Sequence, residues 1–299
     1  MKIVSLLPSA TEIVYALGLG DQLCGVSFEC DFPAEARSVP VVSGTALPTD
    51  VPLTAEQIDG EVSSRLAAGL SIYTLDTALL HEIDPDLILV QDLCRVCAVP
   101  SGAVEEALQV IGGQAEILSL DPKRLDDVIG CIGAVGKATG TPALADEIMD
   151  GLRHCLERVR FRTSGLRPSP RVLFLEWPDP LFVGGHWVPD MIAAAGGTPV
   201  LSAPGAPSRR LEWEDVEAER VDVTVFSPCG FDLEGALSEA ATLLSTVGDS
   251  RLLGRIYAVD ANAHFSRPGP RVVDGVELLA GLIHGEESDL PRDRAYRIA

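Results

Sequence analysis

The 299-residue sequence is poor in aromatic and basic residues. Phe, Trp and Tyr make up 5% of the chain, and 23 Lys and Arg stand against 44 Asp and Glu, which gives a net charge of −21. Nucleic acids and anionic membranes are bound through clustered cations. The charge balance therefore argues against nucleic-acid and membrane partners, and the scarcity of aromatic residues gives each Trp individual weight.

Long apolar runs are also missing. A membrane-spanning helix takes roughly 20 consecutive apolar residues, and no uninterrupted stretch of that length occurs. The N-terminal segment has one Lys and a short apolar run before Pro8, without a cleavage-like site or a lipid-attachment cysteine. We therefore expect a cytoplasmic protein with no membrane insertion. In that compartment, seven cysteines, an odd number, favour thiols or metal ligands over a disulfide framework.

Common motifs for nucleotide and acyl chemistry are absent as well. The sequence contains no P-loop, no G-x-G-x-x-G fingerprint and no G-x-S-x-G elbow. ATP or dinucleotide use therefore has no support. No nucleophile–base pair is readable either, so the sequence leaves open whether the protein is an enzyme and assigns no reaction class.

Alternating strand and helix signals predict an α/β fold. Short apolar runs typical of buried parallel strands recur along the chain. These runs are LILV (87–90), RVLFLE (171–176), VDVTVF (221–226) and RIYAVD (255–260). From Leu125 to about Arg162 the apolar period is helical, with an interruption near 139–142. Near the N-terminus, Ser9 and Glu12 have capping-box spacing, which predicts a helix that starts at Ser9.

We predict two Rossmann-like α/β lobes bridged by one long α-helix, with a ligand cleft between the lobes. The expected parts are an N-terminal lobe over 1–136, a bridging helix over 137–168, a C-terminal lobe over 169–285 and a mobile acidic tail over 286–299.

Four cysteines lie where predicted strands run into loops. Cys30 follows the second strand, Cys94 and Cys97 form a C-x-x-C pair after LILV, and Cys229 follows VDVTVF. Strand ends of an open α/β sheet converge on one crevice. We therefore predict a thiolate site for an iron–sulfur cluster or zinc. If only three of the cysteines bind, the open position on the metal could activate a substrate.

The alternative for these cysteines is simple packing, because cysteine behaves as a small hydrophobe in protein cores. Cys24, Cys131 and Cys155 fit this interpretation, since they fall within a predicted strand or on apolar helix faces.

Two loop segments carry further candidates. In GGHW, two glycines precede His186 and Trp187 and permit close backbone approach at a helix start. In HFSRPGPR, two prolines fix a loop whose Arg267 and Arg271 could clamp a carboxylate or phosphate. The opposing interpretation is a structural histidine and arginines paired with neighbouring acids. The predicted ligand contacts are Trp177, His186, Trp187, Phe231, Phe265, Arg267 and Arg271.

Four segments carry a family resemblance: IVSLLPSATEIVYALGLGD, PDLILVQDLCRVCAVP, WPDPLFVGGHWVPDMIAAAGG and HFSRPGPRVVDGVELLAGLIH. They resemble the cobalamin-binding proteins of the helical-backbone substrate-binding class, which includes periplasmic receptors for cobalamin, haem and ferric siderophores that feed ABC importers. The resemblance implies two α/β lobes bridged by one long helix. The cysteine-bearing segments resemble a cytosol-like subgroup of this class.

Two functions follow as hypotheses. The first is a binding protein for cobalamin, another corrinoid or a related metal chelate, with an ABC importer permease as partner only if the protein is exported. The second is a cytoplasmic metalloprotein or enzyme that holds an iron–sulfur cluster or zinc through Cys30, Cys94, Cys97 and Cys229 and acts on a small anionic substrate.

Overall fold

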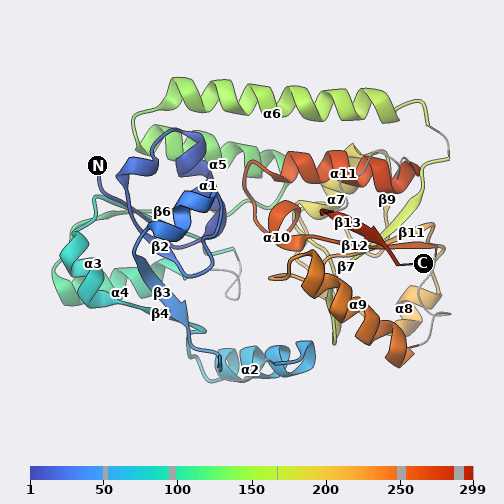
Figure 1. Cartoon of the computed structure of the whole chain (residues 1–299), viewed down its shortest axis with the longest axis horizontal. Helices are drawn as coiled ribbons and strands as arrows, with labels where there is room; N and C mark the ends of the chain where they lie inside the picture. Colours follow the sequence, from blue (N-terminus) through green and yellow to red (C-terminus); the bar gives the residue numbers. More distant parts are fainter. Residues whose placement is uncertain (50–52, 94–98, 167, 248–253, 286–292, 299) are drawn as a thin grey trace. The chain divides into compact units, whose positions relative to one another are not determined.

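A computed structural model gives the fold of residues 1–49, 53–93, 99–166, 168–247, 254–285 and 293–298 (Figure 1). The chain divides into two compact units. Unit 1 comprises residues 1–122 and 129–149, and unit 2 comprises residues 123–128 and 150–299. Two α/β units were predicted, and this prediction is confirmed; the ligand cleft between them stays a prediction.

Unit 1 is built on a six-stranded sheet with the order β4-β3-β2-β1-β5-β6. All neighbouring pairs are parallel except β3 with β4. Its strands are β1 (Ile3–Ser5), β2 (Leu23–Ser27), β3 (Val41–Thr45), β4 (Tyr73–Leu75), β5 (Leu87–Val90) and β6 (Glu116–Ser119). The predicted strand LILV is β5, whose four residues are all buried.

Helices and 3₁₀ turns lie between these strands or follow them. They are α1 (Pro8–Ala16), the 3₁₀ turns η1 (Gly20–Gln22) and η2 (Ala34–Ser38), α2 (Ala55–Ala67), α3 (Thr77–Ile83), α4 (Ser101–Ile111) and α5 (Leu125–Ala138). The predicted start of the first helix at Ser9 is wrong. The helix begins at Pro8, and both Ser9 and Glu12 are buried inside it. Proline favours the first helical position because its fixed φ is already helical and it has no N–H to leave unbonded.

The long helix α6 (Pro142–Thr163) carries the chain from one unit to the other, since its residues belong to unit 1 up to Met149 and to unit 2 from Asp150. It is shorter than the predicted 137–168, because residues up to Ala138 belong to α5 and a turn at 139–141 separates the two helices. A similar transition occurs in α5, whose first residues, 125–128, belong to unit 2.

Unit 2 is built on a seven-stranded mixed sheet with the order β10-β8-β7-β11-β12-β13, with β9 paired to β7. Its strands are β7 (Arg171–Pro178), β8 (Leu181–Val183), β9 (Thr198–Pro199), β10 (Arg209–Arg210), β11 (Val223–Phe226), β12 (Arg255–Val259) and β13 (Ala295–Arg297). The predicted strands RVLFLE, VDVTVF and RIYAVD are thereby confirmed as β7, β11 and β12. These three are mutually parallel, so their carboxyl ends share one edge.

The helices of unit 2, besides the later turns of α6, are α7 (Val188–Ala194), α8 (Trp213–Glu217), α9 (Leu233–Val247), α10 (Ala261–His264) and α11 (Val272–His284). Helices α7 and α11 pack side by side (Figure 1). None of the helices in the described ranges is both long enough and apolar enough to span a bilayer.

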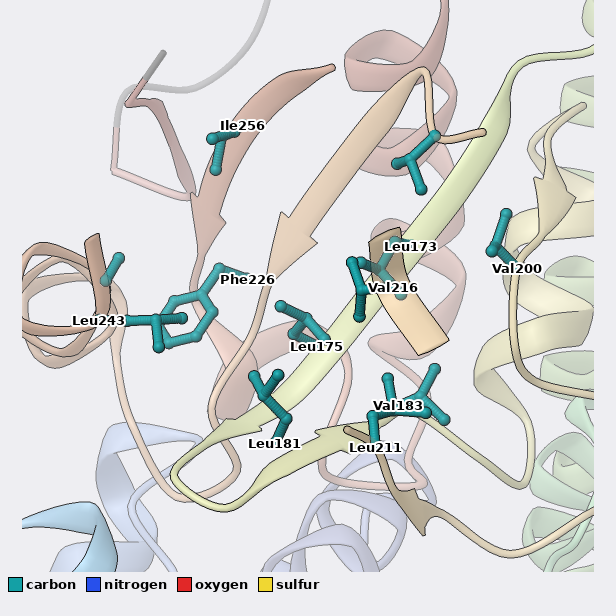
Figure 2. Close-up of a cluster of buried hydrophobic side chains, with 12 residues drawn as sticks. Leu173, Leu175, Leu181, Val183, Val200, Leu211, Val216, Phe226, Leu243 and Ile256 are labelled. Carbon is teal, nitrogen blue, oxygen red and sulfur yellow. The ribbon is translucent and has the colours of Figure 1, made fainter. Parts of the chain in front are cut away.

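One face of the unit 2 sheet carries a buried apolar cluster (Figure 2). Leu173 and Leu175 of β7 point to the same side because they are two residues apart. They pack with Phe226 of β11 and with Val216 of α8. Trp213 packs against this cluster. The cluster makes β7 and β11 a rigid base for the loops that follow them.

The end of the chain includes a short strand. Strand β13 pairs antiparallel with β12, and Ala295 is buried. Residues 295–297 lie within the segment predicted as a mobile acidic tail. Their pairing gives hydrogen-bond partners to the backbone groups on the outer edge of β12. Three of the four acidic residues that suggested mobility, Glu286, Glu287 and Asp289, are outside the described ranges.

Candidate functional site

The carboxyl edge of the unit 2 sheet gathers several predicted ligand contacts. Trp177 lies near the end of β7, and Phe231 lies in the loop after β11. Their ring centroids are 6.0 Å apart at an interplanar angle of 56°. The Trp177 indole N–H donates to the Asp179 carbonyl at 3.1 Å, which fixes the ring against its own turn. Both side chains are half-buried, so each keeps an exposed part of its ring.

Backbone hydrogen bonds hold the loop that carries Phe231. The Cys229 N–H donates to the Glu176 carbonyl at 3.0 Å. The Asn262 amide donates to the Gly230 carbonyl at 3.0 Å, and its backbone N–H donates to the Phe231 carbonyl at 3.2 Å. Cys229 itself is exposed. The loop therefore presents an aromatic ring and a thiol from a backbone tied to its two neighbouring strand ends.

Charged groups lie at the same edge. Burial raises the pKa of Asp260, and Asp232 adds to this, whereas Arg271 and Arg267 act in the opposite direction. The two arginines are therefore electrostatic neighbours of Asp260, which follows β12 and caps α10 through a 2.8 Å bond from the Ala263 N–H. Two guanidinium groups therefore act electrostatically on the residue that follows β12.

The GGHW loop is fixed by its own backbone. His186 has a positive φ of 51° and donates its N–H to the Ala206 carbonyl at 2.6 Å. A Cβ on Gly185 would collide with the backbone nitrogen of Ser208 and would lie 2.5 Å from the Pro207 carbonyl carbon. Burial, and then the charge of Lys123, lower the pKa of His186. The imidazole is thus kept neutral, the form that can ligate a metal.

Two predicted ligand contacts, Trp187 and Phe265, are buried in unit 2. Trp187 is only 7% exposed and donates its indole N–H to the Phe265 carbonyl at 2.8 Å. Phe265 is 2% exposed and packs on Phe174 with centroids 5.2 Å apart. Both rings lie in the interior of unit 2, where burial removes their large apolar area from water. They support the loops, and their contact with a ligand stays a prediction.

The carboxyl edge of the unit 1 sheet has its own polar cluster. Cys30 is buried, and its Sγ lies 3.1 Å from the Thr11 hydroxyl, which is 2.9 Å from the Ser5 hydroxyl. The Cys30 N–H donates to the Ser27 carbonyl at 3.0 Å at the end of β2. Cys30 thus follows a strand end, as predicted, and its sulfur packs against hydroxyl groups.

Two phenylalanines beside Cys30 were missed by the sequence interpretation. Phe28 is 44% exposed and Phe32 is 45% exposed, and Phe28 lies 6.4 Å from Tyr73 between ring centroids. In a chain with few aromatic residues, their position directly after a strand was the signal that could have identified them. Unit 1 therefore also presents exposed aromatic rings at the carboxyl edge of its sheet.

Asp92 follows β5 and plays a structural part. It accepts hydrogen bonds from the Ser101 N–H at 2.9 Å and the Ser119 hydroxyl at 3.0 Å. Burial raises its pKa, but the bonds from Ser101 and Ser119 outweigh that effect and the pKa is lowered. The carboxylate thus ties the β5 loop to the start of α4.

The predicted thiolate site is only partly described. Cys94 and Cys97 lie outside the described residues, Cys30 belongs to unit 1 and Cys229 to unit 2. Within the described ranges, no three His, Cys, Asp or Glu side chains are grouped to hold a metal ion. The metal site therefore stays a prediction. Of the cysteines expected to pack in the core, Cys131 is buried, and Cys24 and Cys155 are half-buried.

The sequence matches a known family along most of its length. Residues 3–266 match the family described as periplasmic binding protein. The chain belongs to this family. It is 24% identical over 282 residues, 93% of the chain and 87% of the relative, to the vitamin B12-binding protein of Vibrio cholerae. It is also 24% identical to an uncharacterized ABC transporter substrate-binding lipoprotein, YvrC, of Bacillus subtilis, over 95% of the chain and 80% of that relative.

Solved structures of periplasmic binding proteins share the fold. The vitamin B12 binding protein BtuF of Vibrio cholerae superposes with a TM-score of 0.65 at 22% identity, covering 96% of this chain and 98% of BtuF. A periplasmic heme binding protein from Pseudomonas aeruginosa superposes with a TM-score of 0.69 at 20% identity, covering 100% and 98%. These likenesses confirm the predicted two-lobe α/β fold.

Proposed function

We propose that the protein binds a corrinoid such as cobalamin, or a related metal chelate, at the carboxyl edge of the unit 2 sheet. The observation that carries this proposal is the Trp177–Phe231 pair, whose centroids are 6.0 Å apart. Arg267 and Arg271, which act electrostatically on Asp260 after β12, supply positive charge in unit 2. Similarity to the vitamin B12-binding protein of Vibrio cholerae supports the ligand class.

The chemistry of this edge suits a flat macrocycle with peripheral charge. Aromatic rings pack well on an extended apolar face. Guanidinium groups pair with the phosphodiester of a corrinoid or the propionates of a haem, and they can do so with two parallel hydrogen bonds. His186, held neutral by burial, is a candidate axial ligand to the metal of the chelate.

Tryptophan fluorescence provides the test. The three tryptophans, Trp177, Trp187 and Trp213, all belong to unit 2. Titration with cyanocobalamin, and separately with haemin, should quench the emission of the wild-type protein. Trp177→Phe should shift this quenching to higher ligand concentration, because Trp187 is buried and Trp213 packs on the core cluster, so neither offers the ligand the ring face that Trp177 offers. Trp213→Phe is the matched control and should be quenched at the same ligand concentration as the wild type.

Calorimetry measures the binding affinity without relying on tryptophan emission, so it shows whether a side chain contributes to binding. Phe231→Ala should weaken binding by about 1–3 kcal/mol, the range expected for a buried aromatic contact. Phe28→Ala tests the exposed ring of unit 1 in the same way. Wild-type protein that binds neither cyanocobalamin nor haemin would refute the proposal.

Delivery to an ABC importer permease forms part of this proposal if the protein is exported. The relatives bear on it, because they are described as a periplasmic protein and a substrate-binding lipoprotein. We expected a cytoplasmic location, and fractionation of cells that produce the protein would decide between the two.

A thiolate metalloprotein of the cysteine-bearing, cytosol-like subgroup is the second proposal. Its basis in the fold is that Cys30 follows β2 and Cys229 follows β11, both at carboxyl edges of sheets. Iron–sulfur and zinc ligation by these residues with Cys94 and Cys97 is tested by metal and sulfide analysis of protein purified without oxygen.

A further inference from the structure

The second half of α6 and the residues after it concentrate positive charge in an acidic chain. Residues 153–171 contain six arginines and one acidic residue, Glu157, whereas the whole chain has 23 basic and 44 acidic residues. This segment belongs to unit 2 and lies away from the carboxyl edge that carries the proposed ligand site, because it leads into the start of β7. The proposed ligand site does not account for it.

The arginines differ in their partners. Arg153 pairs with Asp150 at 3.5 Å, and Arg158 pairs with Glu277 of α11 at 3.7 Å, which places the later turns of α6 beside α11 (Figure 1). Arg160 and Arg162 are exposed and make no ion pair with any residue in the described ranges. Their place in the last turn suits the negative end of the helix dipole, but the dipole does not explain the apolar residue between them.

Phe161 lies between these two arginines and is 86% exposed. On the helix it shares a face with Arg158, three residues before it, and Arg160 and Arg162 flank that face on its two sides. Exposing a phenylalanine leaves a large apolar area in water, and aromatic and arginine side chains dominate the centres of protein interfaces. Arg153, Arg158, Arg160, Phe161 and Arg162 together form what we call the α6 basic patch.

A cavity adjoins the patch. It has a volume of about 280 Å³ and is lined by Arg160, Thr163, Ser164, Ser169, the end of α7 at Ala193 and Ala194, and Gly196 and Gly197. The Ser169 hydroxyl donates to the Gly196 carbonyl at 2.8 Å and the Ser164 hydroxyl to the Phe161 carbonyl at 2.9 Å, so these walls are held in place. The cavity is large enough for a side chain that reaches Arg160 from outside.

We propose that the α6 basic patch is a docking surface for an acidic segment of a partner protein. An apolar side chain of the partner covers Phe161, and carboxylates pair with Arg160 and Arg162. Charge complementarity selects the partner, because the patch is cationic in a chain of net charge −21. An anionic bilayer is disfavoured, since it would repel the rest of the chain and would leave the cavity beside Arg160 without an occupant.

The test uses a dye-labelled acidic peptide with one central leucine, followed by fluorescence anisotropy at low and high salt. The wild-type protein should bind it, and binding should weaken as salt rises. The double variant Arg160→Glu/Arg162→Glu should lose about tenfold or more in affinity, and Phe161→Ser should also weaken binding. The double variant Arg209→Glu/Arg210→Glu on β10 makes the same change in net charge and should bind as the wild type does.

Four results would overturn the proposal. One is no binding at peptide concentrations up to about 1 mM. Another is an equal loss of peptide affinity in the Arg209→Glu/Arg210→Glu control, which would mean that the net charge of the protein, and not the patch, determines binding. A third is binding to phosphatidylglycerol vesicles without binding to the peptide. The last is self-association that is lost in Arg160→Glu/Arg162→Glu, without peptide binding, which would assign the patch to a second copy of this chain.

Discussion

Acid should destabilise unit 2 through His264. This histidine, the last residue of α10, is 4% exposed, and its Nδ1 atom is buried with no hydrogen-bond partner. Burial is the main cause that lowers its pKa, to about 4 from an ordinary value of 6.5; the charge of Arg294 acts in the same direction, and Asp274 opposes it. The folded protein therefore favours the neutral imidazole.

The sign and size of the effect follow from linkage. Because the pKa is lower in the folded state, the unfolded chain binds the extra proton as pH falls through the interval from 6.5 to about 4. The contribution to stability is fully present above pH 6.5 and is lost toward pH 4. The loss reaches about 3 kcal/mol at low pH, and about 2 kcal/mol of it has occurred at about pH 5.

Urea unfolding followed by tryptophan fluorescence isolates this effect, because every tryptophan belongs to unit 2. The free energy of unfolding is measured from pH 7.5 to about pH 5 for the wild type and for His264→Gln, which keeps a polar group without a charge. The wild type should lose about 2 kcal/mol more than the variant over this range. His154→Gln removes an exposed histidine of α6 and should behave as the wild type.

Parallel pH profiles for the wild type and His264→Gln would refute the reasoning. Such a result would mean that the ring is solvated in the folded protein or that another group dominates the acid limb.

Two further predictions concern the GGHW loop and the cysteines. Gly185→Ala should lower the free energy of unfolding by about 1–3 kcal/mol, because a new Cβ would meet the Ser208 backbone; Gly130→Ala on α5, where a Cβ has open space, should instead raise it by about 0.5–1 kcal/mol. Thermal melts of both variants check this pair, and equal melting temperatures would contradict it. If the thiolate proposal holds, Cys94→Ala should abolish bound iron or zinc while leaving circular dichroism unchanged; a variant with full metal content would remove the C-x-x-C pair from the site.

The parallel strands could be predicted because burial on both faces makes them continuous apolar runs. β5, β7, β11 and β12 were all identified in this way. β3 was missed, since its sequence VVSGT lies in a Pro-, Thr- and Gly-rich stretch and only Val42 and Ser43 of its five residues are buried. Its pairing with β2, which includes a bond from the Val26 N–H to the Pro40 carbonyl, is a tertiary interaction that local composition does not encode.

The sequence predicted where along the chain the aromatic residues of the candidate site lie, but not which of their rings are exposed. Trp177 and Phe231 follow strands and keep part of their rings exposed. Trp187 and Phe265 were chosen by the same reasoning, yet both rings turn inward, because the GGHW and HFSRPGPR segments pack on each other through the Trp187 hydrogen bond. That contact joins residues 78 positions apart and cannot be read from either segment alone.

The two edge strands of the unit 2 sheet have a consequence for aggregation. β10 consists of Arg209 and Arg210 alone, and β13 is three residues long and ends at Arg297. A sheet edge that is long, flat and apolar is a template on which another chain can add its own strand. These edge strands are short, so few of their backbone N–H and C=O groups are open to an incoming strand. Their arginine side chains are charged and strongly hydrated, which further disfavours strand pairing. The sheet is thereby protected against polymerisation by strand addition, even in a chain as rich in apolar residues as this one.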